Sequence, residues 1–135
     1  MSWVDNLRST IEAKFKAEWS ATPAANIDFG DNSFSFETPI SSSWVRLSIN
    51  IIDNVNAEIG TKFQRASGII TVQCFTKIGI GEKDSNSLMD SAIAIFQNKS
   101  FNGINCYAMV PVKIGAQDNW FQQNAKFNFT YDIFS

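Results

Sequence analysis

Residues 65–96 read RASGIITVQCFTKIGIGEKDSNSLMDSAIAIF, and this stretch decides the fold. It begins with a run of β-forming residues, 69–75, passes through two glycines at positions 79 and 81, and ends in an amphipathic helical pattern. This order predicts a strand, a sharp turn and a helix. The turn contains no nucleophile, general base or metal ligand, which favours a structural role over catalysis.

The composition predicts one domain over residues 1–135. A chain of this length buries enough surface for a core without disulfides or metal, and 44% of its residues are apolar, including twelve Phe. Eleven basic residues against thirteen acidic ones give a net charge of −2. Because the basic residues are scattered, no electrostatic stripe for nucleic acid or an acidic membrane is expected.

Histidine is absent, which removes the commonest general base and the commonest metal ligand. We therefore expect no catalytic residue, no cofactor site and no metal site, so the protein is predicted not to be an enzyme. Cys74 and Cys106 lie in apolar β-forming runs, which favours buried free thiols; a disulfide between neighbouring strands is the alternative. Asp5 and Arg8 interrupt the N-terminal segment, so no signal peptide or membrane span is expected.

Two helices are predicted from apolar spacings of three and four residues. The first begins at a Ser2 cap and carries one stripe, formed by Val4, Leu7, Ile11, Phe15 and Trp19. The second is capped by Asp84 or Ser85 and reaches about Asn98. Its predicted buried side consists of Leu88, Ala92, Ile95 and Phe96.

Period-two alternation predicts the main strands. Residues 44–52, 68–76 and 104–113 form three of them, and Pro111 indicates an edge position or a bulge in the third. The last strand has the longest alternation, with an inward file of Phe121, Gln123, Ala125, Phe127, Phe129, Tyr131 and Ile133. A short strand or hairpin is expected near Asp31 and Asn32, and residues 53–67 form a long hairpin connection whose arms extend the strands.

These elements follow the order α-β-β-α-β-β. We predict a single-domain α+β fold, a mostly antiparallel β-sheet with two helices packed on one face.

Several sequence patterns are candidate sites. Gly79-x-Gly81 lacks the third glycine of a dinucleotide fingerprint, because position 84 is Asp84. The carboxylate pairs Asp28 with Asp31 and Glu82 with Asp84 lie in polar stretches and are predicted to be solvated turn residues. Trp44 and Trp120 start strands beside polar loops, so each either closes the end of the core or anchors a partner. The charged hairpin segment 62–65 is a second candidate contact.

The assembled pattern resembles the tail terminator proteins of long-tailed bacteriophages, the group of the lambda minor tail protein U and a related family of phage domains. The resemblance covers most of the chain and consists of the order and spacing of weak motifs. These are the N-terminal helix, the strand WVRLSI at 44–49, Arg65-x-x-Gly68 leading into Ile70-x-Val72-Gln73-x-Phe75, the two glycines before the second helix, and the alternating C-terminal strand.

The resemblance implies an α+β subunit that forms a homo-oligomeric ring, commonly a hexamer. Such a ring caps the tail tube at its final length and presents a surface to the head–tail connector, while DNA only passes through the bore. It implies a virion protein of the tail, assembled in the bacterial cytoplasm. By match to the motif, Arg46 and Arg65 are candidate subunit contacts; Lys62, Phe63 and Trp120 are added from the residues alone.

The sequence leaves two other functional interpretations open. One is a different head–tail joining or tail tube subunit, which composition does not separate from a terminator. The other is a small-ligand module, a curved sheet around a helix with an apolar pocket, suggested by the twelve phenylalanines.

Overall fold

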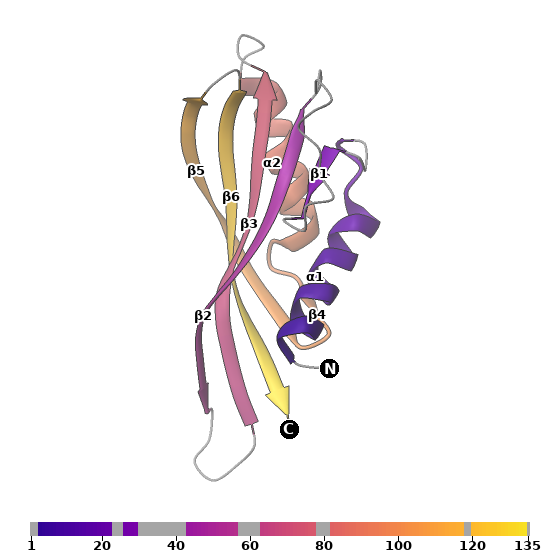
Figure 1. Ribbon diagram of the computed structural model, residues 1–135, viewed down its shortest axis with the longest axis vertical. Helices are drawn as coiled ribbons and strands as arrows, with labels where there is room; N and C mark the ends of the chain where they lie inside the picture. Colours follow the sequence, from indigo (N-terminus) through magenta and orange to yellow (C-terminus); the bar gives the residue numbers. More distant parts are fainter. Residues whose placement is uncertain are drawn as a thin grey trace.

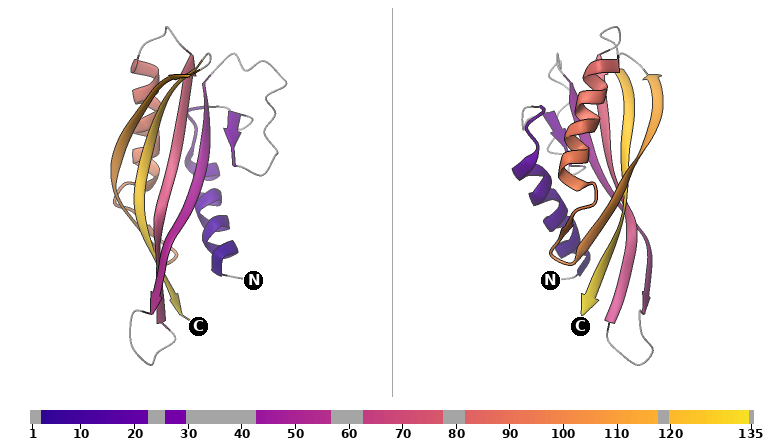
Figure 2. Two further views of the ribbon diagram at one scale, coloured as in Figure 1. Left: turned by 60° about the vertical axis from the view of Figure 1, so that its left-hand side comes forward. Right: turned by 180° about the vertical axis from the view of Figure 1, so that it is seen from behind.

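The structure, a computed structural model, describes residues 3–22, 26–29, 43–56, 63–77, 82–117 and 120–134. The sheet has six strands in the order β1-β2-β3-β6-β5-β4, and every neighbouring pair is antiparallel except β1 with β2. Both helices cover the same face of this twisted sheet (Figures 1 and 2). The elements are α1 (Trp3–Glu18), β1 (Ile27–Asp28), β2 (Trp44–Asn56), β3 (Phe63–Lys77), α2 (Glu82–Phe96), β4 (Ser100–Phe101), β5 (Ile104–Gln117) and β6 (Trp120–Phe134).

The predicted fold class is confirmed: an α+β fold with a mostly antiparallel sheet and two helices on one face. The predicted order α-β-β-α-β-β is not exact, because β1 precedes β2 and β4 precedes β5. Each of these additional strands has two residues. Two residues are too few to show alternation, so a sequence pattern does not reveal them. The hairpin predicted near Asp31 and Asn32 lies outside the described residues.

Helix α1 packs on the sheet through Leu7, Ile11 and Phe15, all buried as predicted, and Trp19 continues the stripe just beyond the helix. The prediction for Val4 is wrong, since this side chain is 43% exposed. Trp3 takes the place in the stripe instead. It lies four residues before Leu7 and packs against Tyr131 of β6, with 6.3 Å between the ring centroids. The predicted Ser2 cap lies outside the described residues.

Helix α2 begins by Glu82, so neither Asp84 nor Ser85 is its N-cap and that prediction is wrong. Ser85 is fully buried, because it falls on the same helical face as the predicted core residues and Met89. The helix ends at Phe96, two residues earlier than predicted. Asn98 follows in the left-handed region with φ 55°, a conformation that terminates helices.

The core lies between this pair of helices and the inner face of the sheet. Alternation predicts the inner face correctly in β3 and β6: Ile70, Val72 and Cys74 are fully buried, and so is the middle of the predicted inward file of β6. Aromatic rings connect the two helices with the sheet. Phe15 of α1 lies parallel to Phe96 of α2 at 6.1 Å, and Phe96 meets Phe127 of β6 at 5.5 Å.

The hairpin of β2 and β3 is longer than its alternating core, as predicted for residues 53–67. β2 runs to Asn56 and β3 starts at Phe63, so the two strands and the end of β6 project beyond the helices (Figure 1). A register shift between Ile51 and Asp53 marks a bulge at Ile52. The bulge ends the inward alternation after Ile51, which pairs with Gly68 and is 38% exposed.

Strand β5 lies at the other side of the sheet and is covered by β4 at residues 104 and 105 only. The predicted edge position of Pro111 is confirmed, and β5 also has two register shifts, between Cys106 and Met109 and between Lys113 and Gly115. The turn from β4 into β5 uses Asn102 and Gly103, which have φ values of 49° and 83°. Short polar and glycine residues tolerate these left-handed conformations.

Candidate functional site

The sheet face turned away from the helices is largely polar. β6 contributes its second file here, and β2 and β3 contribute the pairs Arg46–Gln73, Ser48–Thr71 and Asn50–Ile69. At one end of this outer face, aromatic rings gather in a cluster that we call the outer aromatic cluster: Trp44, Phe75 and Trp120. Trp44 and Phe75 are cross-strand partners stacked at 4.0 Å, and Trp120 meets Trp44 edge-on at 6.3 Å.

The two tryptophans of the outer aromatic cluster differ in their exposure. Trp44 is 4% exposed, so it closes a small second core on the outer face. Trp120 is half-buried beside it and keeps part of its ring accessible. The sequence pattern did not distinguish these two environments, because both residues start strands next to polar loops.

Arg46 is held in place by the outer aromatic cluster and by β1. Its Nε donates a hydrogen bond to Asp28 Oδ2 at 2.8 Å, and another guanidinium nitrogen donates to Gln73 at 3.4 Å. The guanidinium also lies 5.4 Å from the Trp44 ring centroid and 5.8 Å from that of Phe75. Asp28, predicted to be a solvated turn residue, is buried, because its backbone is paired in β1 and its carboxylate faces Arg46.

Replacing Arg46 by methionine is expected to lower the free energy of unfolding by about 2 kcal/mol. The variant keeps an unbranched apolar stem but leaves the nearly buried Asp28 carboxylate without this ion pair; breaking a buried pair costs about 3–5 kcal/mol, and Arg46 is partly exposed here. Urea denaturation measures the loss. The double variant with Asp28→Asn should recover most of it.

The matched control is Arg65→Met, since this side chain is 50% exposed and the variant should lose clearly less stability than Arg46→Met. Equal losses for the two variants would contradict the structural role assigned to Arg46.

Arg65 lies on the same outer face but at the far end of the sheet. Its Nε donates a hydrogen bond of 2.7 Å to Asp132 on β6, and this bond and the carboxylate charge raise the pKa of the guanidinium. Arg65 is eight residues along β3 from Gln73, the partner of Arg46. At 3.4 Å per residue, about 27 Å separates the two arginines, so they do not form one site.

The other two predicted contact residues are only partly described. Lys62 lies outside the described residues, and Phe63 is described by its backbone alone, as the first residue of β3 paired with Phe134. The structure therefore gathers Arg46 and Trp120 at one end of the outer face and places Arg65 on the projecting hairpin.

The edges of the sheet carry residues that the sequence patterns missed. Of the six large apolar side chains exposed among the described residues, five lie on the edge strands β2 and β5. We define the β2 patch as Ile51, Ile52 and Asp53, and the β5 patch as Tyr107, Val110, Lys113 and Ile114. Two adjacent isoleucines interrupt an alternating strand, and this break in the alternation was a readable signal for the β2 patch.

Both patches belong to strand segments with an open edge. Within the described residues, β1 pairs with residues 45 and 46 of β2 only, and β4 with residues 104 and 105 of β5 only. Exposed fractions are 65% for Ile52, 51% for Val110 and 50% for Ile114. Apolar side chains on an open strand edge are typical of surfaces that meet another chain.

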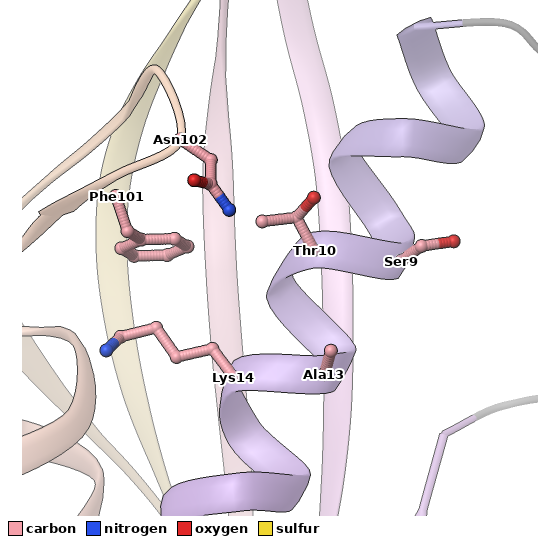
Figure 3. A pocket seen from close by; sticks show the side chains of 6 residues that line it. All are labelled: Ser9, Thr10, Ala13, Lys14, Phe101 and Asn102. Atoms are coloured by element: carbon pink, nitrogen blue, oxygen red, sulfur yellow. The ribbon is translucent and has the colours of Figure 1, made fainter.

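A pocket of about 510 Å³ lies between α1 and the β4–β5 turn (Figure 3). Lys14 reaches from the helix toward Phe101, its ammonium 5.0 Å from the ring centroid, and the same ammonium pairs with Glu18. The lining mixes polar and apolar groups, from Ser9, Thr10, Ala13, Lys14, Phe101 and Asn102. Such a lining differs from the apolar enclosure that a module for apolar ligands uses.

The described residues offer little catalytic chemistry. No group of three or more Cys, Asp or Glu side chains in them is placed to hold a metal ion. Cys74 and Cys106 are free and buried, as predicted, and desolvation raises the pKa of Cys74 to about 12 and that of Cys106 to about 11. Neither thiol is a nucleophile near neutral pH, because the reactive species is the thiolate.

No helix in the described ranges is long and apolar enough to cross a membrane.

Comparison with known proteins establishes the fold alone. The sequence matches no family model and none of the curated proteins. Nine chains of solved structures are similar to it. One of these, a protein known only by a sequence identifier, is 14% identical, with a TM-score of 0.66 over 95% of this chain and 97% of that chain. The arrangement of helices and strands is thus shared over nearly the whole length of both chains.

Proposed function

We propose that this protein is a structural subunit of a bacteriophage tail, a terminator that forms a ring on the end of the tail tube. The observation that carries the proposal is the presence of two different exposed patches on opposite edges of one sheet. A ring needs two distinct, complementary surfaces on each subunit, because each contact is head to tail and the last copy must meet the first. The motif order that resembles tail terminators supports the same class of protein.

The outer sheet face suits a surface past which DNA moves. Two of its arginines are paired with carboxylates, Arg46 with Asp28 and Arg65 with Asp132. The rest of the face is mainly amide and hydroxyl side chains, with Lys77 and Lys126 as further cations. A polar face with few unbalanced charges gives DNA little electrostatic attraction, so a bore lined by it would let DNA pass without retaining it.

In this proposal the partners are other copies of the same chain, the tail tube protein on one side of the ring and the head–tail connector on the other. The protein is then located in the virion tail, and its role is structural. The pocket described above has a mixed lining and gives no specific support to a module for apolar ligands.

Native mass spectrometry and negative-stain microscopy of the purified protein test the proposal. A terminator should give closed rings of one subunit number that do not stack, whatever the protein concentration. Long stacked polymers would instead indicate a tube subunit. A protein that stays monomeric at high concentration, both alone and in the presence of purified tail tubes, would refute ring capping.

A further inference from the structure

We propose that the core holds an ordered water molecule between the first turn of α2 and the end of β3, bound by the side chains of Thr76, Ser85 and Gln123. The site belongs to the fold of a single subunit, so it stands apart from the proposed ring. It accounts for two buried hydroxyl groups and one buried amide that the apolar packing of the core leaves unexplained.

Thr76 Oγ1 and Ser85 Oγ are buried oxygens for which the described part of the chain provides no hydrogen-bond partner. Both side chains are 0% exposed. A buried hydroxyl without a partner lowers stability, and most buried polar groups in folded proteins bond to a residue or to an ordered water. These two hydroxyl groups therefore indicate a bound water.

Both hydroxyl groups face the same layer of the structure. Thr76 continues the buried file of β3 after Cys74, and it pairs with Phe121 in the inward file of β6. Ser85 lies on the buried face of α2, one turn before Met89. Because α2 packs against β3 and β6 (Figure 2), the two side chains enter the layer between helix and sheet from opposite sides.

The two hydroxyl groups also lie at the same end of this layer. Thr76 is one residue before the end of β3 at Lys77. Ser85 is three residues after the start of α2 at Glu82. At about 3.4 Å per strand residue and about 1.5 Å per helical residue, they lie roughly 3 and 5 Å from the element ends that residues 78–81 connect. Such similar depth is what one water needs to bond to both oxygens.

Gln123 provides the third polar group. It is 6% exposed and is the one amide in the otherwise largely apolar inward file of β6. Gln123 pairs with Cys74, so it is a diagonal neighbour of Thr76, about 7–8 Å away. An amide both donates and accepts hydrogen bonds, and a buried water typically makes about three of them. The three side chains therefore supply the partners that a buried water requires.

The chemistry of the site fits water better than an ion. All three side chains are neutral, and Lys113, which pairs with Gln123 from β5, is an exposed residue. A desolvated ion needs an opposite charge beside it, which hydroxyl and amide groups do not provide. Water bonds to both kinds of group, as a donor to their oxygens and as an acceptor from their O–H or N–H.

Removing either hydroxyl tests the site, because a bound water and an unpaired hydroxyl predict opposite results. Thr76→Val and Ser85→Ala should each lower the urea midpoint of unfolding, since the water loses a partner inside the core. A hydroxyl buried without any partner should instead give a higher midpoint, because its desolvation cost disappears. The greater hydrophobicity of valine and the higher helix propensity of alanine also act toward a rise, so a fall is specific to the water.

The double variant tests whether the two hydroxyl groups share one water. Thr76→Val combined with Ser85→Ala should shift the urea midpoint by less than the sum of the two single shifts, because the same water can be lost only once. A higher midpoint in either single variant, or shifts that simply add, would overturn the shared site.

Thr71→Val and Ser87→Ala are the matched controls. Thr71 lies on the outer face of β3, opposite Lys126, and Ser87 is exposed on α2. Neither substitution reaches the layer between helix and sheet, so neither midpoint should fall as it does for Thr76→Val and Ser85→Ala. Equal falls in the controls would assign the loss to the type of substitution and overturn the inference.

A crystal structure of the unmodified chain provides the direct observation. It should show a water within hydrogen-bonding distance of Thr76 Oγ1 and Ser85 Oγ, and the double variant should lack it. A direct hydrogen bond between the two hydroxyl groups, with no water beside them, would refute the site.

Discussion

Replacing Phe127 by alanine is expected to lower the free energy of unfolding by about 4 kcal/mol, the loss typical of a fully buried phenylalanine. Phe127 is 0% exposed at the centre of β6, the strand between β3 and β5. Its ring lies 5.5 Å from that of Phe96, which in turn stacks on Phe15 of α1. The truncation therefore leaves a cavity at the position where the sheet and both helices meet.

Urea or guanidinium denaturation, followed by tryptophan fluorescence, measures this effect. Ile52→Ala is the matched control, because it also removes aliphatic carbons but from a side chain that is 65% exposed; it should change the unfolding free energy by less than about 0.5 kcal/mol. A small loss for Phe127→Ala would mean that the helices are not packed on β6 as described.

Gly68→Ala is the second substitution with a large expected effect, about 3 kcal/mol of destabilisation, at the upper end of the losses typical of overpacking. A β-carbon at this position would overlap the backbone carbonyl oxygen of Asn50 and come within 2.8 Å of the Phe129 ring. The close approach lies beside the bulge of β2, because Gly68 pairs with Ile51 and the register shifts just after that residue. The carbonyl belongs to the backbone, so the strands themselves must move apart to admit a methyl group.

Two further variants identify the cause of that loss. Ser67→Ala, one position away on β3, should leave stability nearly unchanged, because its side chain is on the outer face. Adding Phe129→Leu to Gly68→Ala should not restore stability, since the carbonyl overlap remains. Recovery in this double variant would show that the aromatic ring alone had caused the strain.

The two classes of substitution lead to different expected failures. Loss of Phe127 or Gly68 should reduce the folded fraction, whereas a charge in the β5 patch should leave a folded subunit that does not assemble. Comparing melting temperature and oligomeric state for all variants separates folding from assembly. Folding and assembly must be measured separately because the proposed function of the protein is to assemble into a ring.

The sequence predicted most of the inner architecture because periodicity reports burial directly. Alternation identified the buried residues of β3 and β6, and the spacing of three and four identified those of α1 and α2. Periodicity failed to predict burial where a local irregularity changed the sheet face to which a residue points. At the bulge in β2, the pairing with β3 decides the side that Ile52 and the residues after it face, because a one-residue shift reverses every later side chain.

Two of the predicted contact residues have partners within the chain that the sequence did not reveal, for a related reason. Arg46 proved to be engaged with Asp28, which is eighteen residues away in the sequence and reaches it only through the parallel pairing of β1 with β2. Arg65 is held similarly by Asp132, sixty-seven residues away. Pairings over such distances leave no periodic signal, so a sequence pattern marks the arginine but not its partner.

The sequence by itself determined the class of fold, the helices and central strands, and the apolar faces that form the core, because these follow from the local spacing of apolar residues. Only the tertiary structure decided which strands are edges, where the bulges fall and which apolar residues stay in water. Those properties depend on which segments pair and on what covers them, and both are set by contacts between residues far apart in the chain.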